Sequence, residues 1–290
     1  MPLLSPRFPT PLENLLSNEI TNLLASRFIS RREVKAIQHS DGSWAPHTSD
    51  GKKDSPRLPW GRAALNEHLA GTKTFGHYML DTDSTCKLFA FDIDLEKNKA
   101  PIDGNPGFQG YWVDDEGTVH AFDPRVDWQN RAHPSRNWSK YQLKMVATRF
   151  AAKITEELEI PCAVAYSGGK GVHVYGFTGK VPAIDAREGA DLVLESVGGW
   201  EATRGNNFFK TTDRSPETGY PNLCIEVFPK QETLDRPEAL GNLMRLPLGR
   251  NLKSPDPTFF IDMTSPMGVM KPVDPVFALT TPSPWKSPND

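Results

Sequence analysis

The chain has 290 residues, of which 38% are hydrophobic and 24% are charged, and its formal net charge is −3. This length allows one large domain or two small ones with a sizeable buried core, and the composition is that of an ordinary globular protein. The acidic balance excludes a chain that is basic throughout, so any nucleic-acid binding must use a local patch.

Three cysteines, Cys86, Cys162 and Cys224, are far apart, and each lies in an apolar run typical of a strand. Their spacing fits neither a disulfide framework nor a zinc site, so we expect buried free thiols and no zinc. Free thiols are typical of a reducing, cytoplasmic compartment. We expect no membrane partner, because no apolar run is long enough to span a bilayer and no signal-peptide pattern is present.

The first part of the chain predicts two helices on either side of a polar loop. Leucine and isoleucine residues at helical spacing predict a helix over residues 11–28. Three arginines lie near its end: Arg27, Arg31 and Arg32. They either face a phosphate backbone or lie on a solvated surface. Residues 39–59 predict a loop, and residues 62–69 predict a short helix.

Residues 88–96, Leu-Phe-Ala-Phe-Asp-Ile-Asp-Leu-Glu, predict a strand that follows a shorter strand over residues 78–80. Side chains alternate between the faces of a strand, so Asp92 and Asp94 project from one side, roughly 7 Å apart. Two carboxylates on one rigid face repel each other unless a cation lies between them. Mg²⁺ and Mn²⁺ prefer such oxygen ligands. The alternative is an edge strand with a solvated acidic face.

Residues 98–138 form a long polar connection, of a length that is usually functional or partly mobile. Ser139 can cap an amphipathic helix that runs to Leu158. The next predicted elements, in order, are a strand over Cys162–Tyr166, a strand over 172–177, a helix over 185–196 and a strand over 222–228. We expect residues 1–255 to form a catalytic core and residues 256–290 to be a Pro/Ser-rich tail or a linker to a further domain.

Residues 167–171, Ser-Gly-Gly-Lys-Gly, join two of the predicted strands. Glycine lets backbone N–H groups converge on an anion, and Lys170 adds a positive charge there. The stretch lacks the Gly-Lys-Ser/Thr sequence of a Walker loop, and a plain hairpin is the alternative. On the next strand His173 and Tyr175 share one face. Together, a serine, a lysine and a histidine around one glycine turn favour a phosphate pocket.

Glu226 lies between Ile225 and Val227, so its side chain leaves the last strand on the face opposite its apolar neighbours. Alone it is typical of a half-buried, salt-bridged carboxylate. With Asp92 and Asp94 it makes three strand carboxylates, which suit two divalent cations. Arg245 and Arg250 form a later basic segment that either holds phosphate or is a solvated loop.

Three stretches occur in order: Phe91-Asp-Ile-Asp94, Ser167-Gly-Gly-Lys-Gly-Val-His173 and Ile225-Glu-Val-Phe-Pro-Lys-Gln231. Together they resemble the three motifs of the archaeo-eukaryotic primase superfamily, over roughly residues 75–250. Within it the chain is most similar to primase–polymerase domains of phage and plasmid replicases. The resemblance implies an α/β (α+β) fold with two parts, in which an RNA-recognition-like catalytic sheet is flanked by helices.

The resemblance also implies roles for seven residues. Three would be catalytic and hold Mg²⁺ or Mn²⁺: Asp92, Asp94 and Glu226. Four would bind the incoming nucleotide: Ser167, Lys170, His173 and Arg245. Relatives often carry a zinc-binding stem, which three scattered cysteines do not provide.

The expected activity is a template-directed DNA primase and polymerase that uses nucleoside triphosphates on single-stranded DNA. A helicase domain or partner is expected beside it, in the cytoplasm, or in the host cytoplasm if the protein is viral. Template binding is expected from five arginines: Arg27, Arg31, Arg32, Arg245 and Arg250. The alternatives are a primer-dependent repair-type polymerase, a nicking nuclease and a catalytically silent binding module. The nuclease would need a pair of histidines, and His173-Val174-Tyr175 has one.

Overall fold

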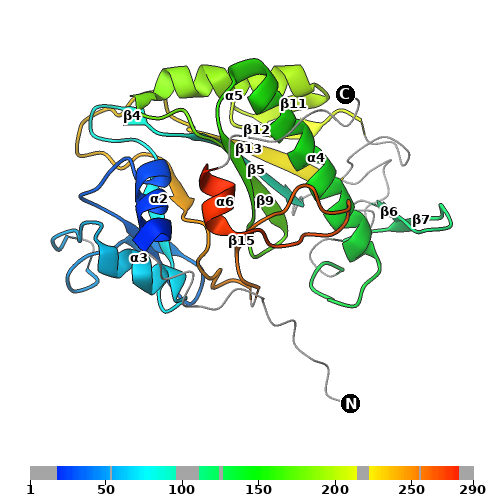
Figure 1. Ribbon diagram of the computed structural model, residues 1–290, viewed down its shortest axis with the longest axis horizontal. Coiled ribbons are helices and arrows are strands. Elements are labelled where there is room, and N and C mark those ends of the chain that lie inside the picture. The colour runs from blue at the N-terminus through cyan, green and yellow to red at the C-terminus, as the bar shows by residue number, and fades with distance from the viewer. Residues whose placement is uncertain are drawn as a thin grey trace, which may run out of the picture.

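A computed structural model describes residues 18–52, 54–95, 111–123, 127–213, 222–254 and 256–280 of the chain. The described residues form a seven-stranded sheet, a four-stranded sheet and two pairs of short strands. Helices α4 (Ser135–Leu158) and α5 (Ala183–Val197) lie across the larger sheet, as Figure 1 shows. Helices α2 (Asn18–Phe28) and α3 (Arg62–Leu69) lie beside the smaller sheet.

The larger sheet is antiparallel throughout. Its strands are, in spatial order, β11 (Trp200–Arg204), β12 (Phe208–Thr211), β13 (Leu223–Phe228), β5 (Phe89–Leu95), β9 (Gly171–Gly176), β8 (Cys162–Tyr166) and β15 (Phe259–Phe260). Along the chain, β5, α4, β8, β9, α5 and β13 follow the order βαββαβ, and their strands lie in the order β13-β5-β9-β8. This is the arrangement of ferredoxin-like and RNA-recognition folds. The predicted fold class is therefore confirmed.

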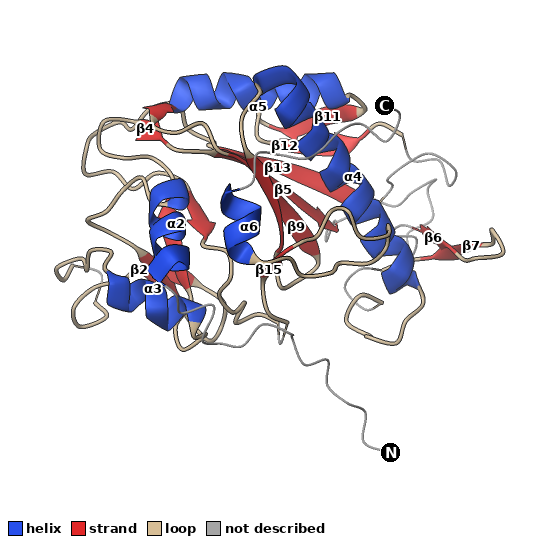
Figure 2. Ribbon diagram, viewed as in Figure 1, coloured by secondary structure: helices blue, strands red, loops and turns tan. Residues whose placement is uncertain are grey.

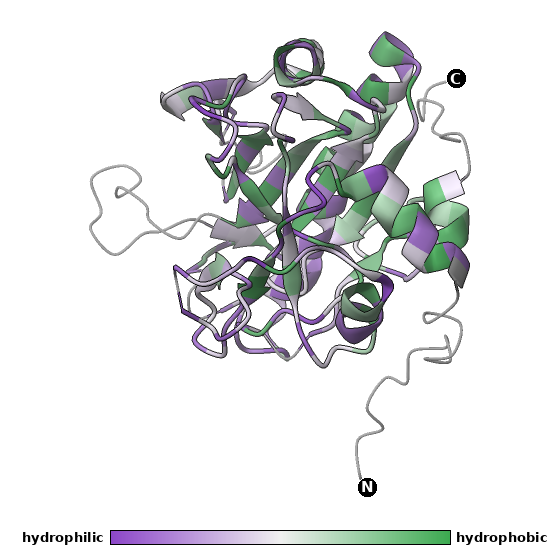
Figure 3. Cartoon of the chain, turned by 90° about the vertical axis from the view of Figure 1, so that its left-hand side faces the viewer, coloured by the Kyte–Doolittle hydropathy of each residue, from purple (hydrophilic) through white to green (hydrophobic). Residues whose placement is uncertain are grey.

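Alternation along β5 explains why its two faces differ. Phe89, Phe91, Ile93 and Leu95 are fully buried, whereas the aspartates between them are half-buried. The ring of Phe91 lies 4.5 Å from that of Phe150 on α4, measured between centroids. Burying a large apolar side chain contributes about 1.5–3 kcal/mol to folding, so this face holds the helices on the sheet. Strands in Figure 3 show corresponding bands of hydrophobic and hydrophilic residues.

The smaller sheet has the order β14-β3-β1-β2. Its strands are β14 (Leu243–Arg245), β3 (Phe75–Tyr78), β1 (Ala36–Gln38) and β2 (Trp44–Pro46). Phe28 at the end of α2 packs edge-on against Tyr175 and Phe177, at 5.0 and 5.3 Å between ring centroids. This contact ties the smaller part to strand β9 of the larger sheet. The other short elements in Figure 2 are β4 (Thr85–Cys86), β6 (Tyr111–Val113), β7 (Val119–Ala121), β10 (Val181–Pro182) and α6 (Pro275–Thr280).

Several element boundaries differ from those that the sequence predicts. Helix α4 begins at Ser135, so Ser139 is a fully buried residue inside the helix and not its cap. The strand expected over residues 78–80 lies over Phe75–Tyr78, because its pairing with β14 and β1 sets its position. Only residues 18–28 of the helix expected over 11–28 are described. Part of the connection 98–138 lies outside the described residues, and its described part includes the β6–β7 hairpin.

Residues 256–280 are part of the packed structure, although the sequence predicts a tail there. β15 pairs with β8, and the chain then runs past α4 to α6. The ammonium group of Lys144 on α4, which is fully buried, donates to the carbonyl oxygens of Asp262, Ser265, Pro266 and Val269 at 2.6–3.2 Å. A segment rich in Pro and Ser can be ordered here because its backbone carbonyls accept hydrogen bonds from a lysine side chain and do not need a neighbouring strand. The division into domains at residue 255 stays a prediction.

Cys86, Cys162 and Cys224 are free cysteines, and the first two are buried. None of the described helices combines the length and apolar character that crossing a membrane would require.

Candidate active site

The acidic residues of β5 lie in a row with side chains from both neighbouring strands. Asp92 is directly opposite Glu226 on β13 and directly opposite His173 on β9. Opposed residues of an antiparallel pair project from the same face with their Cβ atoms about 5 Å apart. Asp94, two residues further along β5, projects from this face too and lies opposite Gly171. The register of three strands therefore brings together residues that are up to 134 positions apart in the sequence.

Each carboxylate in this row has a basic partner. Lys170 Nζ lies 3.3 Å from Asp94 Oδ2, and His173 Nε2 lies 3.4 Å from Asp92 Oδ1. Glu226 is bound by Lys230, whose ammonium also lies 4.8 Å from the centre of the Phe228 ring. Three acid–base pairs thus line one face of the sheet.

The environment shifts the pKa values of two of these acids in opposite directions. Burial alone would raise the pKa of Asp92, but the nearby charges of His173, Arg245 and Lys170 hold it below its usual value. Burial raises the pKa of Glu226, and its ion pair with Lys230 offsets only part of that effect. Asp92 therefore carries its negative charge more readily than Glu226 does.

The carboxylates supply hard oxygen donors, the type that Mg²⁺ and Mn²⁺ prefer. Across the described parts of the chain, however, no three His, Cys, Asp or Glu side chains are arranged to hold a metal ion together. Asp94, Asp92 and Glu226 are instead paired with Lys170, His173 and Lys230 respectively. The chemistry of this donor set fits such a cation.

The glycine turn between β8 and β9 has its carbonyl groups fixed by side chains. Arg245 and Asn251 donate to the carbonyl of Ser167, and Asn251 Nδ2 also lies 3.3 Å from that of Gly168. The carbonyl of Gly169 accepts from Tyr166 Oη at 2.6 Å and from Trp128 Nε1 at 3.1 Å. Gly168 adopts φ +67°, which favours glycine. The turn therefore has a fixed orientation.

The amide groups of the same turn remain available. Among the described residues, the N–H groups of Gly168, Gly169 and Lys170 have no hydrogen-bond acceptor, whereas that of Ser167 donates to the carbonyl of Gly171. Successive free N–H groups in a glycine turn form a concave site for an anion. This arrangement favours the phosphate pocket over the plain hairpin.

His173 is oriented by its neighbour on the strand. Its Nδ1 atom lies 2.8 Å from the hydroxyl of Tyr175, which is fully buried. Burial raises the pKa of the Tyr175 phenol, so the hydroxyl stays protonated and can donate to Nδ1. Donation to Nδ1 fixes the tautomer of neutral His173 in which Nε2 carries the proton and faces Asp92.

A cavity of about 760 Å³ connects the row of acids with the glycine turn. Six of the seven predicted site residues line it: Asp92, Asp94, Ser167, Lys170, His173 and Arg245. Glu226 does not line this cavity, although it lies next to Asp92 on the neighbouring strand. Gln38 of β1, Trp44 of β2 and Arg245 of β14 line it together with residues of the larger sheet, so the cavity lies between the two sheets.

Sequence reasoning missed the residues that hold the glycine turn in place: Trp128, Tyr166 and Asn251. These residue types do not indicate such a role unless the fold is known. Asn251 follows the Arg245–Arg250 segment directly, which is the one hint that the sequence offers. The arginines expected to bind template do not share a surface, since Arg31 is buried against the carbonyls of Pro237 and Ala239.

Comparison with known proteins gives one family and no curated relative. A model of the family described as "TOTE conflict system, Archaeo-Eukaryotic Primase domain" matches residues 21–269. No curated protein matches the chain. The match covers most of the chain, including both sheets and all seven predicted site residues. Domains of this superfamily are nucleotidyltransferases of the primase–polymerase type and generally use divalent metals. The finer similarity to phage and plasmid replicases stays a prediction. The chain belongs to the archaeo-eukaryotic primase domain family of TOTE conflict systems.

Proposed function

We propose that the protein is a template-directed primase–polymerase that makes primers on single-stranded DNA and extends them from nucleoside triphosphates. The observation that carries this proposal is the common cavity of the free turn amides and the paired aspartates. Its volume of about 760 Å³ is within the usual range of small-ligand sites. A triphosphate next to carboxylates needs such an arrangement, because its own charge must be neutralised while a cation is held nearby.

Asp92, Asp94 and Glu226 are the residues that would hold two divalent cations, Mg²⁺ or Mn²⁺. Bound there, the cations would lower the pKa of the primer 3′-hydroxyl and stabilise charge on the phosphate groups. The residues of the chain itself act by holding these groups in position. Strand register fixes where Asp92 and Glu226 stand, and the basic partners Lys170, His173 and Lys230 become free when the acids turn toward the cations.

The glycine turn would bind the triphosphate. Its free N–H groups and Lys170 supply donors and positive charge, and Arg245 lies behind the turn with its guanidinium on the carbonyl of Ser167. Hydrogen bonds to charged groups are worth about 1.5–3 kcal/mol each. In this scheme Lys170 leaves Asp94 and pairs with a phosphate group, which frees Asp94 for a cation. Nucleotide binding and cation binding therefore favour each other.

A nicking nuclease is the weaker reading. Its chemistry needs a tyrosine hydroxyl that can reach a phosphate, but Tyr175 is fully buried and hydrogen-bonded to His173. A primer-dependent repair-type polymerase would use the same site, and only the requirement for a primer distinguishes it. A helicase domain or partner remains an expectation from the family resemblance.

The test is synthesis on a single-stranded DNA template, with and without a primer, with each nucleotide class and with Mg²⁺ or Mn²⁺. Asp92→Asn, Asp94→Asn and Glu226→Gln should each reduce synthesis by about a thousandfold or more, because the cations supply several kcal/mol. Glu156→Gln, on the surface of α4 and paired with Lys153, is the matched control. Normal synthesis by Asp92→Asn would disprove the proposal, and product formed only with a primer would identify the repair-type alternative.

A further inference from the structure

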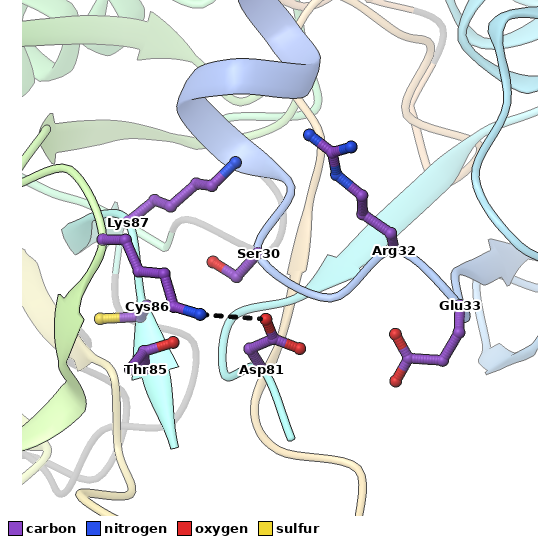
Figure 4. Close-up of a pocket in the computed structure, with 8 residues that line it drawn as sticks. Ser30, Arg32, Glu33, Asp81, Thr85, Cys86 and Lys87 are labelled. Carbon is purple, nitrogen blue, oxygen red and sulfur yellow. Dashed lines mark ion pairs between the residues drawn. The ribbon is translucent and has the colours of Figure 1, made fainter. Parts of the chain in front are cut away.

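A second cavity, of about 350 Å³, lies at the other end of β5 from Asp94 (Figure 4). Basic side chains reach it from three separate segments. Arg32 follows α2, Lys87 precedes β5, and Lys180 precedes β10. In Figure 4 the side chains of Lys87 and Arg32 lie on either side of the chain that leaves α2. Neither residue belongs to the site described above.

The charges in this cavity are only partly matched. Lys180 is paired with Asp83 at 2.8 Å and with Asp81 at 3.8 Å, and Glu33 is paired with Arg31. Neither Arg32 nor Lys87 has a carboxylate partner among the described residues. The carboxylate of Asp81 also lines this cavity, and its charge acts on Lys87 although the two form no ion pair among the described residues. Two neighbouring cations without an ion-pair partner favour an anion between them.

The only contact of the Lys87 ammonium with an oxygen among the described residues is at 3.3 Å, to the carbonyl of Ala25 in the last turn of α2. A basic group at a helix C-terminus is stabilising, so Lys87 has a structural role as well. After burial, the charge of Arg32 is the next cause that lowers the pKa of Lys87, which agrees with their closeness. Arg32 is exposed and has no such structural role.

Arg32 also borders a separate hollow. This hollow, of about 360 Å³, lies between α2 and α3 and is also lined by Trp60 and Arg62. The indole Nε1 of Trp60 is buried and has no hydrogen-bond partner among the described residues. Two hollows that share an arginine, one of them also lined by an aromatic side chain, suit an extended polymer better than a single small anion.

We infer that Arg32 and Lys87 bind a backbone phosphate of a single-stranded nucleic acid, whose chain continues along the hollow beside Trp60. The inference rests on the proposed function only in that the strand would be the template. Arg32 and Lys87 would give the acidic protein the local basic contact that template binding requires. The contact would act on any sequence, because it involves phosphate and not base edges.

The experiment measures binding of a labelled single-stranded oligonucleotide by fluorescence anisotropy, over a series of salt concentrations, without nucleotide. Arg32→Ala should weaken binding equally for different sequences and reduce the slope of log affinity against log salt by about 0.7. Lys87→Gln should act in the same direction. Lys153→Ala, at a partly exposed lysine of α4, is the control and should leave the slope unchanged.

Melting temperature is measured on every variant, because Lys87 also contacts α2. Arg32→Ala at full melting temperature with an unchanged salt slope would overturn the inference, whatever Lys87→Gln does. Inorganic phosphate forms the second arm. If phosphate raises the melting temperature through Arg32 while oligonucleotide binding is independent of Arg32, the site binds a small anion and the inference is wrong. Loss of oligonucleotide binding in Arg32→Ala supports the inference even if the protein shows no synthesis. The binding result can therefore be interpreted independently of the proposed activity.

Discussion

The Asp94 carboxylate fills the space beside Gly171, its partner across strands β5 and β9. A Cβ atom at residue 171 would overlap with Asp94 Oδ1 and with the carbonyl of Ile93. Glycine is therefore required here by a close approach, and its position in the turn motif has a direct structural cause.

Gly171→Ala should displace Asp94 and abolish or strongly reduce synthesis, with a lower melting temperature as well. The overlap involves the backbone of Ile93, so the strands must shift to relieve it. Gly169→Ala is the matched control, because its Cβ would lie 3.3 Å from Asn251 Nδ2 and 3.6 Å from Ser167 Oγ. It should keep a melting temperature close to that of the wild type. Equal melting temperatures and equal cation affinity for Gly171→Ala would contradict this account.

Tyr175→Phe should lower the turnover number by about two- to tenfold while the protein stays folded. The substitution removes the hydroxyl that orients His173 and leaves an apolar ring in a fully buried position. A lost hydrogen bond of this kind is worth about 0.5–1.5 kcal/mol, which corresponds to a factor of about 2–10. Steady-state kinetics at saturating template measure the effect. An unchanged turnover number at wild-type stability would mean that His173 needs no orientation.

Asn251→Ala should raise the Michaelis constant for nucleotide more than it changes the affinity for single-stranded DNA. Asn251 donates to the carbonyls of Ser167 and Gly168, so its loss lets the turn reorient its N–H groups. We expect a rise of several-fold to about tenfold. Ser254→Ala, in the same cavity wall but without a bond from its side chain to the turn, serves as the comparison. Equal effects of the two substitutions would contradict a specific role for Asn251.

Acid should destabilise the protein through two buried histidines. Burial lowers the pKa of His77 to about 3 and that of His68 to about 4 from the ordinary value of 6.5. Above pH 6.5 both are neutral in the folded and unfolded chain, so they contribute nothing. As the pH falls further, only the unfolded chain binds these protons, and each histidine lowers the free energy of unfolding by up to about 1.4 kcal/mol per pH unit.

The His77→Leu variant tests this prediction. Both ring nitrogens of His77 lack a hydrogen-bond partner among the described residues, so leucine removes a buried polar group without breaking a bond. Denaturant unfolding at several pH values between about 7 and 4 should show a smaller loss of stability in the variant than in the wild type. His39→Leu, at an exposed position, should leave the pH dependence unchanged. Parallel curves for His77→Leu and wild type would refute the assignment.

Lys144→Met should be among the most destabilising single changes in the chain. It removes the charged donor that binds the carbonyl oxygens of Asp262, Ser265, Pro266 and Val269, at a cost of about 3 kcal/mol or more. The segment 262–269 should become sensitive to limited proteolysis before the rest of the protein does. Lys153→Met on the exposed side of the same helix is the control. A stable variant with a protected segment would contradict this role of Lys144.

Local patterns were sufficient to predict much of the central sheet. Alternation in residues 88–96 identified β5 and the common face of its aspartates, and helical spacing identified α4 and α5. The glycine turn was located correctly between β8 and β9. These features depend on neighbouring residues, which a single sequence displays directly.

Long-range contacts could not be predicted in this way. The pairing of Asp92 with both Glu226 and His173 depends on strand order, which local spacing does not encode. The order of residues 256–280 depends on Lys144, a residue type that is usually exposed. The carboxylates were expected to repel each other, but each has a basic partner, so removing one leaves an unpaired cation. Removing one of these acids should therefore not stabilise the protein.

Because strand register aligns Glu226, Asp92 and His173, the site is either complete or absent in a given molecule. A shift of one strand by a single residue would turn its site residue to the opposite face and bring an apolar neighbour such as Phe91 out of the core. The cost of exposing that core opposes every slipped alignment. A folded molecule with one strand in a shifted register is therefore unfavourable in free energy. A substitution that weakens the register should lower the fraction of folded molecules, while each folded molecule keeps a complete site.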